Sequence, residues 1–412
     1  MTLETSALPV ARRATAPTLP ARARFWTAAA VAGVALWTSA APTTTYPLYA
    51  STWHLTSAVT TAIFAVYPIV LVVFLVIFGQ VSDFIGRRNA MLIGVGALFV
   101  GVLLFAVAPS VGWVFAGRAF MGAGVGFALA PATAAAVEFS RTGQEGRASS
   151  TVTAATAAGL SLATIVGGGL IQYAPLPLHL DFWVLLVVVA AVLVMVYFLP
   201  RRSAAAAEGT WRPRPIRIPA GIRLLYATAA AAVTAAYAFG SVFLALGADV
   251  AKDLIGSHNV LVTGLVLAIM STMIGVTAVL ARRFAPGRLV IAGALITVVD
   301  LALLVLSAQT HSLPLFMVTT VFAGAGYGLL FSGGLGLIAT HAPAHHRGGT
   351  ISAVYLVAYV FQGAIAFTLG AIATAGGLGT ALVIGAVAIG VLAATAFLLA
   401  GIVRRATREE KR

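Results

Sequence analysis

The chain alternates between long apolar runs and short polar segments. Twelve apolar runs lie near residues 26–48, 57–79, 90–108, 113–137, 149–172, 180–199, 223–246, 258–281, 289–309, 313–337, 351–374 and 378–402. Most reach the roughly 20 residues that a helix needs to cross a hydrocarbon layer about 30 Å thick. The runs are apolar on almost all sides, as expected for helices that contact both lipid and one another. We therefore predict an all-α integral membrane protein with twelve transmembrane helices.

Composition supports this prediction and excludes several kinds of protein. Of the 412 residues, 60% are hydrophobic and 9% are charged, whereas soluble domains carry about a quarter charged residues. An ordinary soluble enzyme is therefore excluded. The chain has no cysteine, which also excludes disulfides, thiolate metal sites and thiol nucleophiles.

The basic residues predict the orientation of the spans. All Lys and Arg residues except Arg118 and Lys252 fall before the first run, after an even-numbered run, or after the last run, with Arg223 at the start of the seventh run counted with the loop before it. Such residues flank the cytoplasmic ends of spans, so both termini are expected in the cytoplasm and the protein in the cytoplasmic membrane. The first run is too long for a signal-peptide core and lacks a cleavage site, so we expect it to be retained. The net charge of +14 then indicates contact with anionic membrane lipid and no nucleic-acid partner.

The chain also divides into two similar halves. We expect a cytoplasmic arm at 1–25, a bundle of six spans at 26–199, a cytoplasmic linker at 200–222, a second bundle at 223–403 and a cytoplasmic tail at 404–412. Residues 120–127 read FMGAGVGF and residues 322–329 read FAGAGYGL, and a Gly-Arg pair at 86–87 recurs at 287–288. Chance similarity between Gly- and Ala-rich helices is the alternative to duplication. Two parallel repeats predict a central cavity between the bundles and alternating access by rocking.

Two motifs identify a family resemblance. Residues 79–89 read GQVSDFIGRRN, which closely resembles the G-x-x-x-D-x-x-G-R-[RK] signature of the major facilitator superfamily. The fourth run contains Arg118, Gly122 and Gly124 in a pattern similar to that family's R-x-x-x-G-x-G motif. The resemblance implies a fold of two pseudo-symmetric six-helix bundles, secondary transport of a small-molecule substrate, and a monomer.

The residues of the first motif have a predicted role in gating. Asp83 is placed to face the positive N-terminal end of a helix from the other half, while Gly79 and Gly86 permit close helix approach and a tight turn. The resemblance also implies that Arg87 pairs with Glu138 at the end of the fourth run. Such contacts would close a cytoplasmic gate in one state and separate in the other. The alternative is that the arginines of this loop only anchor the topology.

The fifth run bears on the direction of transport. From Gly159 to Gly168 it resembles the G-x-x-x-G-P-x-x-G-G motif of drug/proton antiporters, with Ala163 and Thr164 in place of the Gly-Pro pair. The resemblance favours drug efflux, and the replacement weakens that inference. The remaining glycines still permit close helix packing.

Most acidic residues fall at the ends of the predicted spans, including Asp181, Asp249 and Asp253 at external ends. Asp300 alone falls in the middle of a span. An ionisable group at that depth is costly and is a functional candidate, because a carboxyl group kept from water can exchange protons near neutral pH. Asp300 is therefore the candidate for proton coupling. The resemblance, however, puts this span outside the central cavity, which leaves a structural role open.

Arg118 is the candidate for direct contact with substrate, because it is a cation inside a span that lines the cavity in the family. A buried arginine that bonds helix carbonyls is the alternative. Aromatic and polar side chains expected around the same cavity are Trp37, Tyr46, Tyr67, Tyr237, Phe243, Phe322, Tyr327, Tyr355, Tyr359 and Gln362. A cavity with many rings and few charges suits a moderately hydrophobic organic solute.

These observations predict a secondary transporter that exports a small, drug-like solute by proton antiport. The alternative is proton-coupled uptake of an organic acid, with Arg118 holding its carboxylate. No metal or cofactor is predicted: His341 and His345 have helical spacing, but Pro343 between them disfavours that helix. No span offers a nucleophile with a base, so we expect no enzymatic activity.

Overall fold

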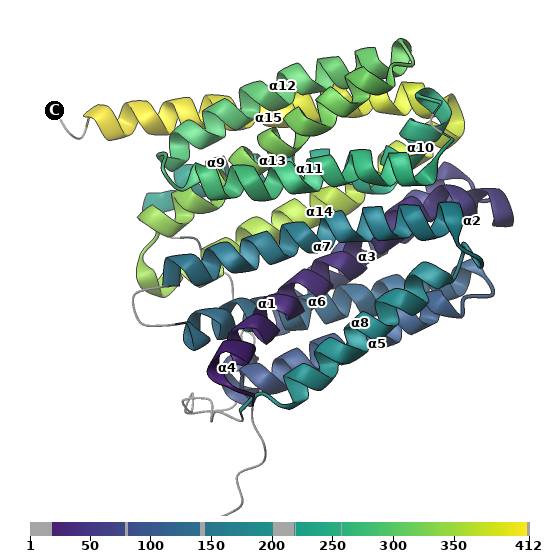
Figure 1. Ribbon diagram of the computed structural model, residues 1–412. Coiled ribbons are helices and arrows are strands. Elements are labelled where there is room, and N and C mark those ends of the chain that lie inside the picture. Colours follow the sequence, from purple (N-terminus) through teal and green to yellow (C-terminus); the bar gives the residue numbers. More distant parts are fainter. Residues whose placement is uncertain are drawn as a thin grey trace, which may run out of the picture.

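The protein is all-helical in the computed structural model, which describes residues 19–78, 81–140, 145–200, 218, 220–256 and 258–409 (Figure 1). In chain order the helices are α1 (Ala21–Ala40), η1 (Ala41–Thr44), α2 (Tyr46–Trp53), α3 (Ser57–Phe78), α4 (Ser82–Ile85), α5 (Arg87–Ala106), α6 (Val111–Phe139), α7 (Glu145–Tyr173), α8 (Leu180–Tyr197), η2 (Ala220–Ile222), α9 (Arg223–Ser241), η3 (Val242–Leu246), α10 (Gly247–Asp249), η4 (Val250–Leu254), α11 (Val260–Ala281), α12 (Pro286–Gln309), α13 (Leu313–His341), α14 (Ala344–Gly376) and α15 (Leu378–Glu409). Most of the predicted linker lies outside these residues.

Twelve helices of the described chain are long and apolar enough to cross a membrane, so the predicted number of spans is confirmed. The structure corrects two of the spans. The first was predicted to run unbroken to residue 48, but the α-helix ends at Ala40 and a 3-10 turn containing Pro42 follows, because proline has no N–H to continue the helical ladder. The seventh extends to Leu254 and contains two π-helical turns, η3 and η4.

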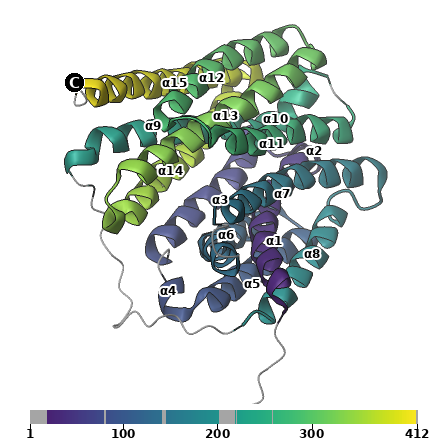
Figure 2. The ribbon, with the colours of Figure 1, turned by 60° about the vertical axis from the view of Figure 1, so that its left-hand side comes forward.

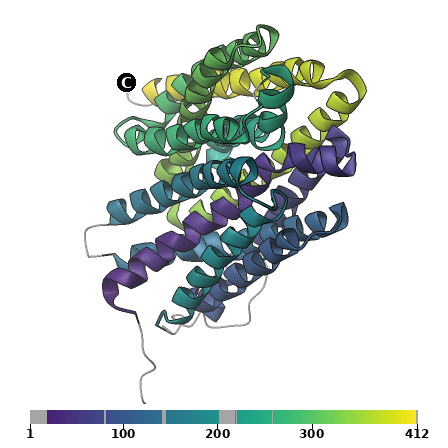
Figure 3. The same cartoon turned by 45° about the vertical axis from the view of Figure 1, so that its right-hand side comes forward.

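The helices form two bundles that correspond to the two halves of the chain. Helices α1 to α8 occupy the lower part of Figure 1 and α9 to α15 the upper part, and Figure 3 gives the same division from another side. Within each bundle, α5 packs along α6 and α12 packs along α13. Glycines permit these close approaches: Gly94 and Gly124 meet between α5 and α6, where a Cβ at Gly124 would lie 2.7 Å from Gly94 O.

The bundles touch through two helix pairs, α7 with α11 and α3 with α14. At the first crossing, a Cβ at Gly168 would lie 2.7 Å from Val260 O, and one at Gly264 would overlap Thr164 O. At the second, a Cβ at Gly370 would lie 2.7 Å from Ser57 O. We call these two crossings the seal. Small residues are needed there because each helix approaches the backbone of the other.

Hydrogen bonds join the same end of the bundles. The Ala58 amide donates to Thr374 Oγ1 (2.9 Å), and the Val260 amide donates to Gln172 Oε1 (2.8 Å). This end, with the loop residues 54–56, 174–179, 255–256 and 258–259, is the sealed end. Farther from the seal, α7 and α11 line a groove of about 620 Å³ that includes Ala154, Val279 and Leu280, although a Cβ at Gly275 would still lie 2.6 Å from Ala157 Cβ. In Figure 2 the ends of α3 and α14 that lie away from the seal are well apart.

Candidate functional site

Arg118 lies on α6 and is fully buried (0% exposed). Its Nη1 donates to Ser39 O (2.8 Å) and its Nη2 to Phe64 O (3.4 Å). The guanidinium also lies over two rings, 4.7 Å from the centroid of Tyr67 and 5.6 Å from that of Phe64. Arg118 therefore ties α6 to the middle of α3 and to the end of α1.

The sequence explains why these carbonyls accept an external donor. Phe64 is four residues before Pro68, which lies inside α3, and proline has no N–H to bond the carbonyl of residue i−4. Ser39 lies just before α1 changes to the tighter 3-10 turn of η1, where the bonding pattern shifts to i−3. Of the guanidinium nitrogens of Arg118, Nε has no hydrogen-bond partner among the described residues. The alternative given above, that Arg118 is a buried arginine which bonds helix carbonyls, thus has a specific physical basis.

A group of stacked rings occupies the other bundle. Tyr237 on α9 lies 6.0 Å from Tyr327, 6.0 Å from Phe331, 6.4 Å from Tyr355 and 4.7 Å from Tyr359, measured between ring centroids. Helix α13 supplies Tyr327 and Phe331, and helix α14 supplies Tyr355 and Tyr359; the two rings of each helix are four residues apart. Side chains four apart share one helix face, which is why one tyrosine of α9 contacts all of them.

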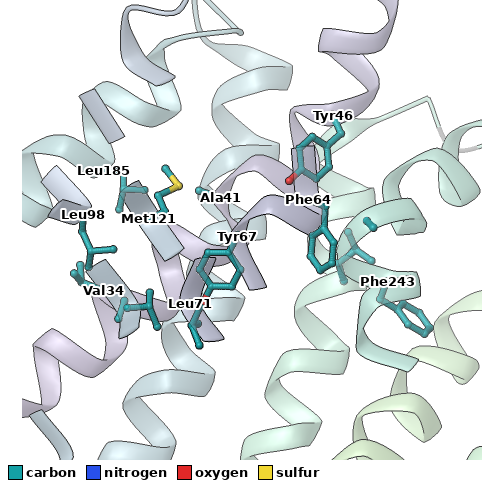
Figure 4. Close-up of a cluster of buried hydrophobic side chains, with 14 of the residues drawn as sticks. Val34, Ala41, Tyr46, Phe64, Tyr67, Leu71, Leu98, Met121, Leu185 and Phe243 are labelled. Carbon is teal, nitrogen blue, oxygen red and sulfur yellow. The ribbon is translucent and has the colours of Figure 1, made fainter. Parts of the chain in front are cut away.

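Tyr67 of the first bundle belongs to the buried hydrophobic cluster against which Tyr327 and Tyr359 pack. We call Tyr67, Tyr237, Tyr327, Phe331, Tyr355 and Tyr359 the aromatic site. Nearby, Tyr46, Phe64 and Tyr67 lie in one cluster with Phe243 of the opposite bundle (Figure 4).

The other predicted substrate residues are placed differently. Trp37 Nε1 and Gln362 Oε1 are buried without a hydrogen-bond partner among the described residues, so each can still bond a solute. Phe243 stacks on Phe316 (6.3 Å between centroids). Phe322 is 41% exposed on the outer face of α13, and the structure does not bring it to the aromatic site.

Two residues were not predicted from the sequence: Phe331 of the aromatic site, and Phe64, whose ring and carbonyl contact Arg118. Helical spacing could have identified both residues. Phe331 follows Tyr327 by four residues and Phe64 precedes Tyr67 by three, so each shares a helix face with a predicted tyrosine.

Of the predicted gating residues, Asp83, Gly86 and Arg87 lie in or next to α4, and Glu138 lies in the last turn of α6, away from the seal. Gly79 and the side chain of Asp83 lie outside what the structure describes. Gly86 has φ 87°, a conformation that favours glycine, which agrees with the predicted tight turn. Arg87 Nη1 donates to Ser82 Oγ (2.8 Å), while Glu138 is exposed at the end of α6; between these two described residues no ion pair is formed.

Asp300 is fully buried (0% exposed) on α12, and neither carboxyl oxygen has a hydrogen-bond partner among the described residues. Helix α12 packs mainly against α13 and α15, and it lies at the top of Figure 1, far from the first bundle. The structure therefore does not bring Asp300 to the aromatic site.

No group of three or more His, Asp or Glu side chains that could hold a metal ion occurs among the described residues.

The sequence profile of the Major Facilitator Superfamily matches residues 26–362. A search of curated proteins found no match.

Solved structures share the fold. A peptide transporter (POT) in complex with sulfate superposes with a TM-score of 0.74 at 16% identity, covering 95% of this chain and 97% of that one. A bacterial homologue of the human lysosomal transporter Spinster, inward-facing and unoccupied, gives 0.70 at 13%, covering 93% and 98%. The nucleoside transporter NupG gives 0.70 at 11%, covering 91% and 99%.

Proposed function

Since this chain belongs to the major facilitator superfamily and is a secondary transporter of a small solute, we propose that it exports a moderately hydrophobic, drug-like organic compound in exchange for protons. The protein then works as a monomer in the cytoplasmic membrane, with both termini in the cytoplasm and lipid around its outer faces. Alternating access moves the solute, and no cofactor takes part.

The aromatic site is the observation that carries this proposal. Five of its rings belong to one bundle, and Tyr67 comes from the other. A planar organic molecule between the bundles would stack on these rings, while the phenol hydroxyls, Trp37 Nε1 and Gln362 Oε1 offer hydrogen bonds. No Asp, Glu, Lys or Arg belongs to the site itself, which suits an uncharged or weakly charged solute.

The two ends of the bundles support alternating access. With the predicted orientation, the sealed end faces the outside, and the groove between α7 and α11 lies nearer the cytoplasmic ends of these helices. The structure then corresponds to an inward-facing state. In the opposite state the cytoplasmic ends close, and Asp83 and the Arg87–Glu138 pair form the gate there.

Helix α7 supports export. A Cβ at Gly159 would overlap Gly33 O of α1, and Gly168 packs against the backbone of α11 at Val260. The glycines of the antiporter-like motif thus make the close contacts that such a motif would provide, although Thr164 replaces its proline.

Uptake of an organic acid is the second candidate, favoured by the unpartnered Arg118 Nε. Both Nη atoms already bond carbonyls, however, so a carboxylate could not form the usual bidentate pair with this arginine.

Transport into proteoliposomes distinguishes these functions. The purified protein is reconstituted, a panel of aromatic solutes and organic acids is added outside, and the pH gradient is imposed in either direction. An acidic lumen drives solute inward by antiport, whereas an acidic exterior drives it inward by symport, whichever way the protein is inserted. Antiport of aromatic compounds supports the proposal. Symport of organic acids, or transport that an ionophore collapsing the gradient leaves unchanged, contradicts it.

Two substitutions test the proposed roles of Tyr237 in substrate binding and of Asp300 in proton coupling. Replacing Tyr237 with Leu removes the ring that all the others of its bundle contact, and we expect the half-saturating concentration of the solute to rise about tenfold or more, from a loss of roughly 1.5 kcal/mol of stacking. Phe367→Leu on the exposed face of α14 is the control. Asp300→Asn tests the coupling group: downhill exchange of solute should persist while the pH gradient no longer drives accumulation.

A further inference from the structure

A second carboxyl group is buried at the sealed end. Asp181 lies in the first turn of α8 and is 1% exposed. Neither of its oxygens has a hydrogen-bond partner among the described residues. The sequence placed it only at the external end of a span, so its burial is decided by the tertiary structure.

The surroundings of Asp181 form a small oxygen-lined site. A Cβ added at Gly167 of α7 would lie 2.7 Å from Thr44 Oγ1 and 3.1 Å from Asp181 Oδ2. Two side chains from η1 and α8 therefore face the same glycine. Thr44 Oγ1 also lacks a hydrogen-bond partner in the described chain. Only a residue without a side chain leaves room for both oxygens at this point of α7.

Among the described residues, no Lys, Arg or His forms an ion pair with Asp181. On α2, Tyr49 is close enough to act electrostatically on the carboxyl group, but its hydroxyl donates to Leu178 O (3.4 Å). The other titratable groups around this corner are Tyr46 on α2, His179 just before α8, and Lys252 and His258, which line a pocket of about 150 Å³ with Thr44. Asp249 lies on α10, which contacts α2 and η1. Arg118 acts on Tyr46 and is bonded to two carbonyls. Apart from Arg118, the described residues of α1, α5, α6 and α7 carry no Asp, Glu, Lys, Arg or His at this end.

Burial without a partner decides the protonation of Asp181. An ionised carboxylate that is buried without a partner costs more free energy than the N-terminal end of a helix returns. In the closed structure the carboxyl group is therefore neutral and carries a proton.

The site adjoins the seal. Gly168, next to Gly167, meets Val260 O and Leu261 of α11. The turn η1, which carries Thr44, contacts α11 and η3 of the other bundle. When the bundles part at this end, α11 leaves this turn of α7 and water gains access to the corner where Asp181 lies.

We propose that Asp181, with Thr44 and Gly167, forms a proton-binding site whose occupancy sets the seal: the seal closes only while Asp181 is protonated, and opening exposes it to the external medium. This inference rests on the proposed proton coupling, and it adds to Asp300 a second site with a different task. Because the closed state holds one more proton than the open state, acid favours the closed state, and the closed-to-open ratio falls by up to tenfold per pH unit as the pH rises.

The test measures the conformational equilibrium without transport. The chain has no cysteine, so Ser51→Cys on α2 and Thr380→Cys on α15, both exposed at the sealed end, accept one spin label each from opposite bundles. Their distance distribution is recorded in lipid nanodiscs over a pH series on both sides of neutrality. We expect a long-distance population that grows with pH.

Variants test whether the pH dependence of this distance arises from Asp181. Asp181→Asn, which has nearly the same shape and no charge, should stay closed at every pH, and Asp181→Glu should restore the titration. The exposed Asp253→Asn at the same end should titrate like the parent. A parent equilibrium that does not change with pH, one that follows sodium concentration instead, or pH dependence that survives in Asp181→Asn would each overturn the inference. If no pH gradient drives transport by the parent in proteoliposomes, the proposed function fails, whatever Asp181→Asn does.

Discussion

The seal offers a sharp test of how the bundles move, at Gly264 of α11. A Cβ at this position would overlap Thr164 O of α7 and lie 3.0 Å from the same carbonyl carbon. The obstacle is backbone of the other bundle, so no rotamer change relieves the overlap. Gly264→Ala therefore destabilises the state in which the seal is closed. It does not destabilise the state in which α7 and α11 separate, because the clash is absent there.

The size of the effect follows from overpacking. Extra methyl groups forced into a packed contact cost about 1–3 kcal/mol, which lowers the ratio of closed to open seal by roughly 5- to 150-fold. Alanine also stabilises a helix interior relative to glycine by about 0.5–1 kcal/mol, but equally in both states. Gly379→Ala in the first turn of α15 is the matched control, because a Cβ there meets nothing within 4 Å.

Two pairs of spin labels report on the two ends. Labels at Ser51 and Thr380 span the sealed end, and labels at Asn89 and Arg283, exposed near the other end, span the opposite one. In Gly264→Ala we expect the first distance to lengthen and the second to shorten, with slower transport. Parent-like distances and rates in a correctly folded Gly264→Ala protein would refute the idea that this crossing must open during transport.

Further predictions concern Arg118 and Asp83. If Arg118 bonds the Phe64 carbonyl because Pro68 cannot, then Pro68→Ala should reduce the stability cost of Arg118→Met by about 1 kcal/mol; additive losses in denaturant unfolding would argue against it. Normal transport by both Arg118→Lys and Arg118→Ala would exclude a role of this arginine in substrate binding. Asp83→Asn should nearly abolish transport while folded protein remains in the membrane, and full activity would exclude its gating role.

The hydrophobic pattern alone predicted the twelve spans, because each span must satisfy its own backbone hydrogen bonds and present an apolar surface to lipid. Local chemistry in the sequence also predicted the turn at Gly86. The aromatic site was predictable in part, since helical spacing places Tyr355 with Tyr359, but the same reasoning did not distinguish the inward face of α13 from the outward face that carries Phe322.

What the tertiary structure decided is which groups meet across helices that are distant in the chain. The sequence marked Arg118 as a buried cation, but only packing assigned it the carbonyl near Pro68 in another helix. The sequence indicated Asp300 as a functional candidate because of its depth in the membrane, and it did not indicate Asp181 at the end of a span. Both carboxyl groups are nevertheless buried without hydrogen-bond partners among the described residues. In a protein whose helices are apolar on all sides, hydrophobicity specifies that a helix spans the membrane, while its rotation and neighbours depend on how small residues such as Gly167, Gly168 and Gly264 let the backbones approach.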